Sequence, residues 1–313
     1  MKNNTITYLT AVVLLFILSN SACTSAPTIA DTTTSGTVKV GIDESFQSMM
    51  NAELEIFHDN NPNATIKTMW QPESKCIEDL LIDSVRSIVI GSQLSSKDSL
   101  RFIKAKVAPE VRHIAIDAIG LLLHSSNKDT TFTISQLENI FTGKIKTWNE
   151  INPKSNADTI VIVMDSPNSS NSNYLKKRFC NGADFPTNIY ALHSNVEVMD
   201  YVKKHPNAIG VIGVNWISDK TDTLGVKFLH GIKIASLETM AAKEEAGEYC
   251  KPYQAYIALK AYPLIRNVYI IGNKARGLGV GLASFITSQR GQLIVKTEGL
   301  MPAKAPVRLI QLE

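Results

Sequence analysis

Cysteine and histidine are scarce in this chain of 313 residues, which has four cysteines and six histidines. Neither type occurs at a metal-ligand spacing, and there is no CxxC pair and no HExxH motif. We therefore expect no metal and no cofactor. Outside the N-terminal segment, Cys76, Cys180 and Cys250 are odd in number. Two of them could pair in an exported protein, but the leading prediction is three small buried side chains.

Net charge is also low. The formal charge is +3 at pH 7, and no basic stripe with interleaved aromatic residues is present, so nucleic acid is not an expected partner. A hydrophobic content of 44% with 19% charged residues is typical of a globular protein. The length allows one large domain or two lobes, each with its own core.

The N-terminus has the pattern of an export signal. "MKNNTITYLTAVVLLFILSNSAC" places an early lysine before an apolar run from Ala11 to Leu18, which is short for a bilayer span, and small residues follow. We predict a signal peptide over 1–22, acylation of Cys23, and a polar tether over 23–36. Ordinary cleavage without a lipid remains the alternative, because Asn20 stands where a lipidated signal usually has a small apolar residue.

After the tether, short β-rich runs alternate with helical segments. "TVKVGI", "ATIKTMW" and "RSIVIG" predict strands, and the segments after them, among them "SFQSMMNAELEIFHDNNP" and "SKDSLRFIKAK", predict helices. A long apolar β run, "HIAIDAIGLLLHSS", precedes a second set that starts at "TISQLENIF". This order predicts an α/β fold with a mostly parallel sheet, divided into two lobes with a ligand cleft between them.

One strand-to-helix junction is unusually rich in small polar residues. "MDSPNSSNSNYLKKRF", Met164 to Phe179, gathers Ser and Asn side chains between the apolar run "TIVIV" and a helix. Free backbone N–H groups and the helix dipole favour an anion at such a helix start. A single residue would suffice to cap the helix, so the run exceeds what capping needs. Similar junctions occur at Ser45, Ser74 and Ser92.

Four segments resemble landmarks of the phosphate-binding proteins that serve phosphate ABC importers. They are "FTISQLENIFTGKIKTWNEINP" (132–153), "AIGVIGVNW", "AYPLIRNVYI" and "FITSQRGQLIVKTEGLMP", in the family's order. The resemblance covers the chain from about Thr37 onward. It implies a periplasmic binding protein fold of the second type, with lobe 1 over 37–118 and 229–313 and lobe 2 over 119–228.

The resemblance also implies a phosphate site. The residues at the family's ligand positions are Ser45, Phe46, Ser74, Ser92, Ser169, Ser170 and Asn171. Two departures stand out: Asp165 occupies the position of the family's phosphate-clamping arginine, and Ser92 that of its usual acid or arginine. The replacement for the lost proton acceptor could be Asp43, Glu44 or Asp117, although an Asp at a strand end more often bonds backbone.

Three functions follow as hypotheses. The leading one is a solute-binding protein, lipid-anchored in the periplasm, that captures inorganic phosphate or a similar oxyanion for the permease subunits of an ABC importer. An enzyme is disfavoured because "NSSNSN" is not a GxSxG elbow and no motif places a base beside it. The third is a surface lipoprotein or sensor that kept the fold and binds another oxyanion or none.

Overall fold

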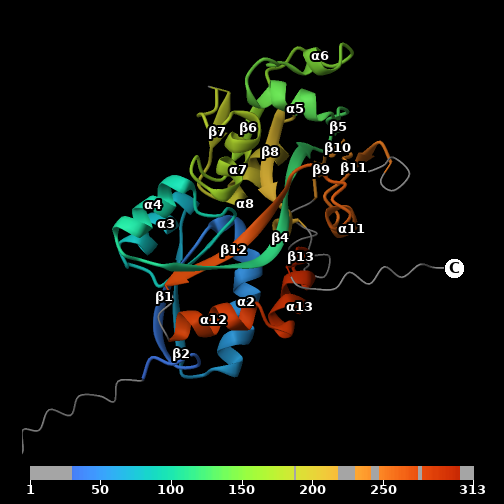
Figure 1. Ribbon diagram of the computed structural model, residues 1–313. Helices are drawn as coiled ribbons and strands as arrows, with labels where there is room; N and C mark the ends of the chain where they lie inside the picture. The colour runs from blue at the N-terminus through green and yellow to red at the C-terminus, as the bar shows by residue number, and fades with distance from the viewer. Residues whose placement is uncertain (1–29, 187, 218–229, 241–246, 274–276, 304–313) are drawn as a thin grey trace, which may run out of the picture. The chain divides into compact units, whose positions relative to one another are not determined.

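The computed structural model describes residues 30–186, 188–217, 230–240, 247–273 and 277–303 (Figure 1). The predicted signal peptide, Cys23 and most of the predicted tether lie outside these residues, so they stay predictions. No helix within the described ranges is both long enough and apolar enough to cross a membrane.

Strands and helices alternate along the chain. The strands are β1 (Gly36–Ile42), β2 (Ala64–Trp70), β3 (Ser87–Ile90), β4 (Pro109–His124), β5 (Thr131–Phe132), β6 (Val161–Met164), β7 (Ile189–Ala191), β8 (Ala208–Gly213), β9 (Ile232–Ile234), β10 (Ser236–Glu238), β11 (Tyr249–Cys250), β12 (Ile265–Asn273) and β13 (Met301–Pro302). The helices are η1 (Glu44–Phe46), α2 (Gln47–Asn60), α3 (Glu73–Leu81), α4 (Ser96–Lys104), α5 (Ile134–Phe141), α6 (Trp148–Ile151), α7 (Ser170–Phe179), α8 (Asn195–Lys204), η2 (Val214–Trp216), α11 (Gln254–Ala258), α12 (Leu278–Ile286) and α13 (Gln289–Thr297).

Local sequence explains several helix ends. Thr133 begins α5 with a capping box, in which its hydroxyl accepts from the Gln136 amide and the Gln136 side chain accepts from the Thr133 amide. At the other end of a helix, α2 stops at Asn60, just before Asn61 and Pro62, because a residue that precedes proline disfavours the helical conformation.

The main sheet is mixed, whereas the sequence predicted a mostly parallel one. Its strand order is β2-β1-β3-β12-β4-β8-β6-β7, with β9 and β13 also paired to β4. The pairs β1–β2, β1–β3, β6–β7 and β6–β8 are parallel, as expected from the alternation of strands and helices. The prediction failed at β4 and β12, which pair antiparallel with their neighbours and join the two parallel groups.

Apolar side chains on both faces of the sheet explain how the helices are held. In β12, Val268 and Ile270 pack in one hydrophobic cluster with residues of α2, α12 and α13. The alternate residues Tyr269 and Ile271 pack in another cluster with residues of α3 and α4. Because successive side chains of a strand point to opposite faces, this strand holds a helical layer on each side.

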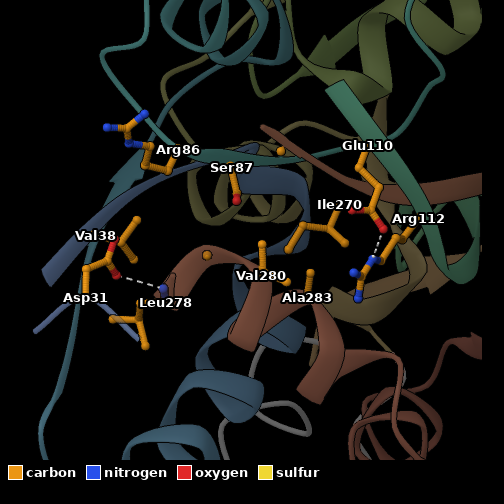
Figure 2. A pocket seen from close by; sticks show the side chains of 12 residues that line it. Asp31, Val38, Arg86, Ser87, Glu110, Arg112, Ile270, Leu278, Val280 and Ala283 are labelled. Atoms are coloured by element: carbon orange, nitrogen blue, oxygen red, sulfur yellow. Dashed lines mark hydrogen bonds and ion pairs between the residues drawn. The ribbon is translucent and has the colours of Figure 1, made fainter. Parts of the chain in front are cut away.

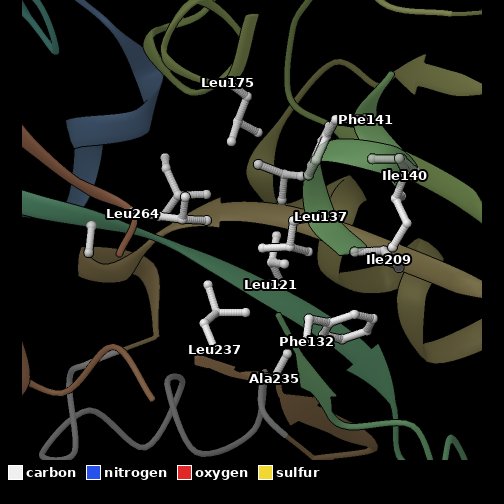
Figure 3. Close-up of a cluster of buried hydrophobic side chains, with 14 of the residues drawn as sticks. Leu121, Phe132, Leu137, Ile140, Phe141, Leu175, Ile209, Ala235, Leu237 and Leu264 are labelled. Carbon is white, nitrogen blue, oxygen red and sulfur yellow. The ribbon is translucent and has the colours of Figure 1, made fainter. Parts of the chain in front are cut away.

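The second half of β4 organises a further core. Leu121 packs with Phe132, Leu137 and Phe141 (Figure 3). The same cluster includes Leu123 and residues of β6, β8, β10 and α7. Leu122, between Leu121 and Leu123, belongs to the cluster on the opposite face, which lies under α8. The three cysteines in the described residues are free thiols; Cys76 and Cys250 are buried, as predicted, whereas Cys180 is half-buried.

Candidate functional site

The predicted anion-binding residues meet at three buried carboxylates. We call Asp43, Glu73 and Asp165 the carboxylate cluster; their exposed fractions are 0%, 3% and 1%. Asp43 follows β1, Glu73 is the first residue of α3, and Asp165 follows β6 just before α7. Polar groups at the ends of parallel strands and the starts of helices thus converge where ligands bind in open α/β folds.

Asp43 connects three short segments through backbone amides. Its Oδ1 accepts from the Ser45 amide at 2.9 Å, which caps η1. Its Oδ2 accepts from the Glu73 amide at 2.8 Å and from the Ser170 amide at 2.9 Å. One carboxylate oxygen therefore lies between the N-termini of α3 and α7, where two helix dipoles favour negative charge.

Glu73 uses both oxygens. Its Oε2 accepts from the Gly91 amide at 3.0 Å and from the Ser170 hydroxyl at 2.8 Å. Its Oε1 accepts from the Ser92 hydroxyl at 3.0 Å and from the Asn173 side-chain amide at 3.1 Å. A carboxylate that accepts this many bonds is held in a single orientation.

Asp165 completes the cluster from the β6–α7 junction. Its Oδ1 accepts from the Ser169 hydroxyl at 2.6 Å. Its Oδ2 accepts from the Ser45 hydroxyl and from the Asn171 side-chain amide, each at 3.2 Å. The residue that replaces the clamping arginine of the family pattern is thus bound by hydroxyls and an amide.

Burial makes the cluster electrostatically costly. It raises the pKa of Asp165 to about 6, and the Asp43 charge adds to this, while the Ser169 hydroxyl opposes it. The pKa of Glu73 is raised, first by burial and then by the Asp43 charge, against the hydrogen bonds from Ser170, Asn173 and Ser92. Burial and the nearby Asp43 charge therefore disfavour the charged forms of Glu73 and Asp165, while the Arg266 charge lowers the pKa of Asp165.

The arginine that faces this region is engaged elsewhere. Arg266 donates to Asp117 Oδ2 through Nε at 3.0 Å and Nη2 at 2.8 Å, and both side chains are buried. Its guanidinium also lies over the Phe46 ring, 4.8 Å from the centroid. Asp117, one of the suggested proton acceptors, is therefore an ion-pair partner of Arg266.

The seven predicted residues fall into different environments. Ser45, Ser169, Ser170 and Asn171 are buried and contact the carboxylate cluster directly. The other three do not converge in the same way. Ser92 touches Glu73 from a half-buried position, and the Phe46 amide donates to the Asp43 carbonyl. Ser74 is exposed, with its amide 3.3 Å from the Asn168 carbonyl oxygen.

Glu73 is the residue of the carboxylate cluster that the sequence did not predict. An acidic residue in the first turn of a helix is common because it complements the dipole, so the position of Glu73 after Pro72 does not by itself indicate a ligand site. Asp43 was identified as a possible proton acceptor, and its position at a strand end was the available signal. Nothing local in the sequence indicates that either side chain points toward α7.

A pocket of about 600 Å³ opens beside the cluster. Its lining includes Asp43, Asp165 and Glu44, together with Trp70 and Leu192. Burial raises the pKa of Glu44, against the hydrogen bond from the Asn195 amide. The walls nearest the cluster are therefore acidic.

A smaller cavity of about 110 Å³ lies between the sheet and α12 (Figure 2). Its charged side chains already have partners. Arg86 bonds Asp83, Arg112 bonds Glu110, and Asp31 accepts from the Leu278 amide. Because these charged side chains already bind groups of the protein, the cluster is the better candidate. Within the described residues, no group of three or more His, Cys, Asp or Glu side chains is arranged to hold a metal ion.

Comparison with known proteins identifies the family. A sequence model of the PBP superfamily domain matches residues 27–290. The chain belongs to this superfamily. It is 24% identical to the phosphate-binding protein PstS of Pseudomonas aeruginosa over 216 residues, which are 64% of this chain and 62% of that protein. PstS of Bacillus subtilis is 22% identical over 269 residues, 86% of this chain and 81% of that protein.

Solved structures agree on the two-lobed type II fold. A putative phosphate ABC transporter substrate-binding protein from Clostridium perfringens, with bound phosphate, matches at a TM-score of 0.71 and 21% identity, over 86% of this chain and 100% of that one. An ABC-type phosphate transport receptor from Vibrio cholerae matches at 0.64 and 16%, over 85% and 100%. The predicted resemblance and fold are thereby confirmed. These relatives are solute-binding proteins, the class predicted in place of an enzyme.

Proposed function

We propose that this PBP superfamily protein is an exported solute-binding protein that captures inorganic phosphate in its cleft for the permease subunits of an ABC importer. The names of its relatives support this substrate and this partner. The predicted signal peptide would direct export, and the predicted lipid on Cys23 would hold the protein at the membrane in the periplasm; both belong to the proposal.

The convergence of donors on the Asp43 carboxylate carries the proposal. The amides of Glu73 and Ser170, at the starts of two helices, donate to the same carboxylate oxygen. Close by, the Gly91 amide donates to the Ser170 hydroxyl, which in turn donates to Glu73. Carboxylate oxygens here stand in for those of an oxyanion, which backbone amides and hydroxyls can hold without a cation.

We propose the lobe organisation with one change. The first crossing at 118–119 is supported by β4, whose pairing passes there from β12 to β8. The second crossing was predicted at 228–229. Ala235 and Tyr262 pack in the same cluster as the second half of β4, so we propose that this crossing lies at about Leu264.

Calorimetric titration of the anion-free protein with phosphate, and separately with sulfate, tests the proposed function. We expect one-to-one phosphate binding that Ser170→Val weakens at least tenfold, because the change removes a hydroxyl donor and adds an apolar group among the converging amides. Ser125→Val, at an exposed serine just after β4, is the matched control and should leave binding unchanged. Absence of phosphate binding, even when the carboxylates are neutralised, would contradict the proposal.

A second candidate function is favoured by the cluster itself. A phosphate dianion about 5 Å from a single carboxylate is repelled by roughly 7 kcal/mol at an effective dielectric constant of 20. Three carboxylates thus favour a protein of this fold that binds no free anion at neutral pH, such as a sensor or surface lipoprotein. Titration with no heat from either anion would support this candidate.

A further inference from the structure

The bonds across the cleft end on carboxylates of the protein itself. From the side of β6 and α7, Ser170 donates to both Asp43 and Glu73, and Asn173 donates to Glu73. In the opposite direction, the Ser45 hydroxyl donates to Asp165. The groups expected to close over a ligand are therefore bonded to acidic side chains.

A fourth carboxylate makes the same kind of contact at the edge of the cleft. Glu44 Oε1 accepts from the amide of Asn195, the first residue of the ten-residue helix α8, at 3.1 Å. Next to it, the Trp216 indole donates to the Ser45 carbonyl at 3.0 Å. The N-termini of α3, α7 and α8 each thus bind a carboxylate from the other side of the cleft or its floor.

Close packing accompanies these bonds. The Gly91 amide donates to the Ser170 hydroxyl at 2.9 Å, and a Cβ on Gly91 would lie only 2.8 Å from the Ser170 Cβ. At Gly91 and Ser170 the two sides therefore meet directly, without room for a tetrahedral anion between these two residues. Ser169 and Ser170 are each only 2% exposed, so this contact is also largely closed to solvent.

We propose that the cleft closes on its own carboxylates, with Asp43, Glu73 and Asp165 in the positions of oxyanion oxygens, so that the protein closes without a ligand and a free anion binds only by displacing them. This inference rests on the proposed function for the identity of the cleft. It makes the three acidic residues determinants of specificity. Their negative charge disfavours multiply charged anions, and the hydrogen bonds that they accept hold the lobes together when no anion is bound.

Closure without ligand is the direct test. Small-angle X-ray scattering on the anion-free protein should give a compact radius of gyration that phosphate does not reduce further. Hydrogen exchange should show the Ser170 and Gly91 amides protected under the same conditions. An extended anion-free protein with fast exchange at both amides would overturn the inference.

Removing the carboxylates supplies the second test. Glu73→Ala should enlarge the anion-free radius of gyration and accelerate exchange at Gly91 and Ser170 at least tenfold. Glu73→Gln keeps the side-chain volume and tests charge in case the alanine variant does not fold. It should weaken the protection of the Gly91 and Ser170 amides less than Glu73→Ala does. It should also increase phosphate affinity at least tenfold over wild type, because one buried negative charge is gone. Glu78→Gln, at an exposed glutamate of the same helix, is the matched control.

The outcomes separate this inference from the proposed function. Anion-free closure with no phosphate binding in any variant supports closure of the cleft on its own carboxylates and contradicts phosphate transport. If the anion-free protein is open and closes when it binds phosphate, that result supports transport and overturns the proposed closure on the carboxylates. Unchanged exchange in both Glu73 variants would also overturn it.

Discussion

At the scale of single residues, the sequence hides which acidic side chains are buried. Asp43, Glu73 and Asp165 look like ordinary helix-start or turn residues, and their burial depends on the opposite lobe. Glu53, in the middle of α2, is another example. Its side chain is 0% exposed, and neither of its carboxyl oxygens has a hydrogen-bond partner among the described residues.

Glu53 should make stability depend on pH. Its pKa is raised from 4.5 to about 8, first by burial and then by the Glu298 charge. Because the folded state binds this proton more tightly than the unfolded state, the stabilisation is complete below 4.5 and is lost as pH rises through 8. Between pH 5 and pH 9, wild type should lose on the order of 3 kcal/mol of unfolding free energy relative to Glu53→Gln.

Denaturant unfolding of wild type and Glu53→Gln at both pH values measures this difference. Glu55→Gln, at an exposed residue two positions along the same helix, is the control and should follow wild type. Parallel pH profiles for wild type and Glu53→Gln would show that Glu53 is not the responsible group.

At the scale of helices and strands, short-range signals predicted most of the elements. The starts of α5 and α7 follow from capping side chains, and Ser169 does cap α7, accepting from the Ser172 amide at 3.2 Å. Strand direction was less predictable, because β4 and β12 pair over long sequence separations and no local pattern records their partners. The remaining polar residues of the α7 start bind carboxylates, so capping accounts for only part of that run.

The capping box of α5 provides a test at this scale. Thr133→Ala should lower the free energy of unfolding by about 1 kcal/mol, because the Gln136 amide loses its acceptor at the helix start. Thr297→Ala, at an exposed threonine in the last turn of α13, should cost less, since that hydroxyl donates to the Ile294 carbonyl and caps no free amide. Thermal or denaturant unfolding compares the two, and equal losses would contradict a capping role.

At the scale of the whole molecule, the decisive contact is between the segment after β3 and the start of α7. Gly91 is needed there because a side chain would collide with Ser170, whose Cβ would lie 2.8 Å away. On the proposed lobe organisation Ser170 comes from the other side of the cleft, so its collision with the added Cβ exists only in the closed state. On its own side of the cleft, that Cβ would also lie 3.2 Å from Phe46 Cζ. The hydrophobic clusters of the two lobes do not include either residue.

Gly91→Ala should therefore hold the lobes apart, with some loss of stability from the tight contact between the added methyl group and Phe46. Scattering should show a larger radius of gyration with and without phosphate, and exchange at the Ser170 amide should become faster. The double variant Gly91→Ala/Ser170→Gly removes the colliding side chain and should restore closure at least in part. A single variant as compact as wild type would show that the cleft tolerates the added methyl group.

The sequence by itself determined the class of this protein. Alternating strands and helices, capping residues and four family landmarks are local patterns, and each can be recognised without knowledge of distant contacts. Only the tertiary structure decided what fills the site. The Ser170 amide meets the Asp43 carboxylate across 127 residues of sequence, and the Ser170 hydroxyl meets Glu73 across 97. Such pairings depend on how the two lobes pack, because hydrogen bonds and burial act through space while sequence patterns record only neighbours along the chain.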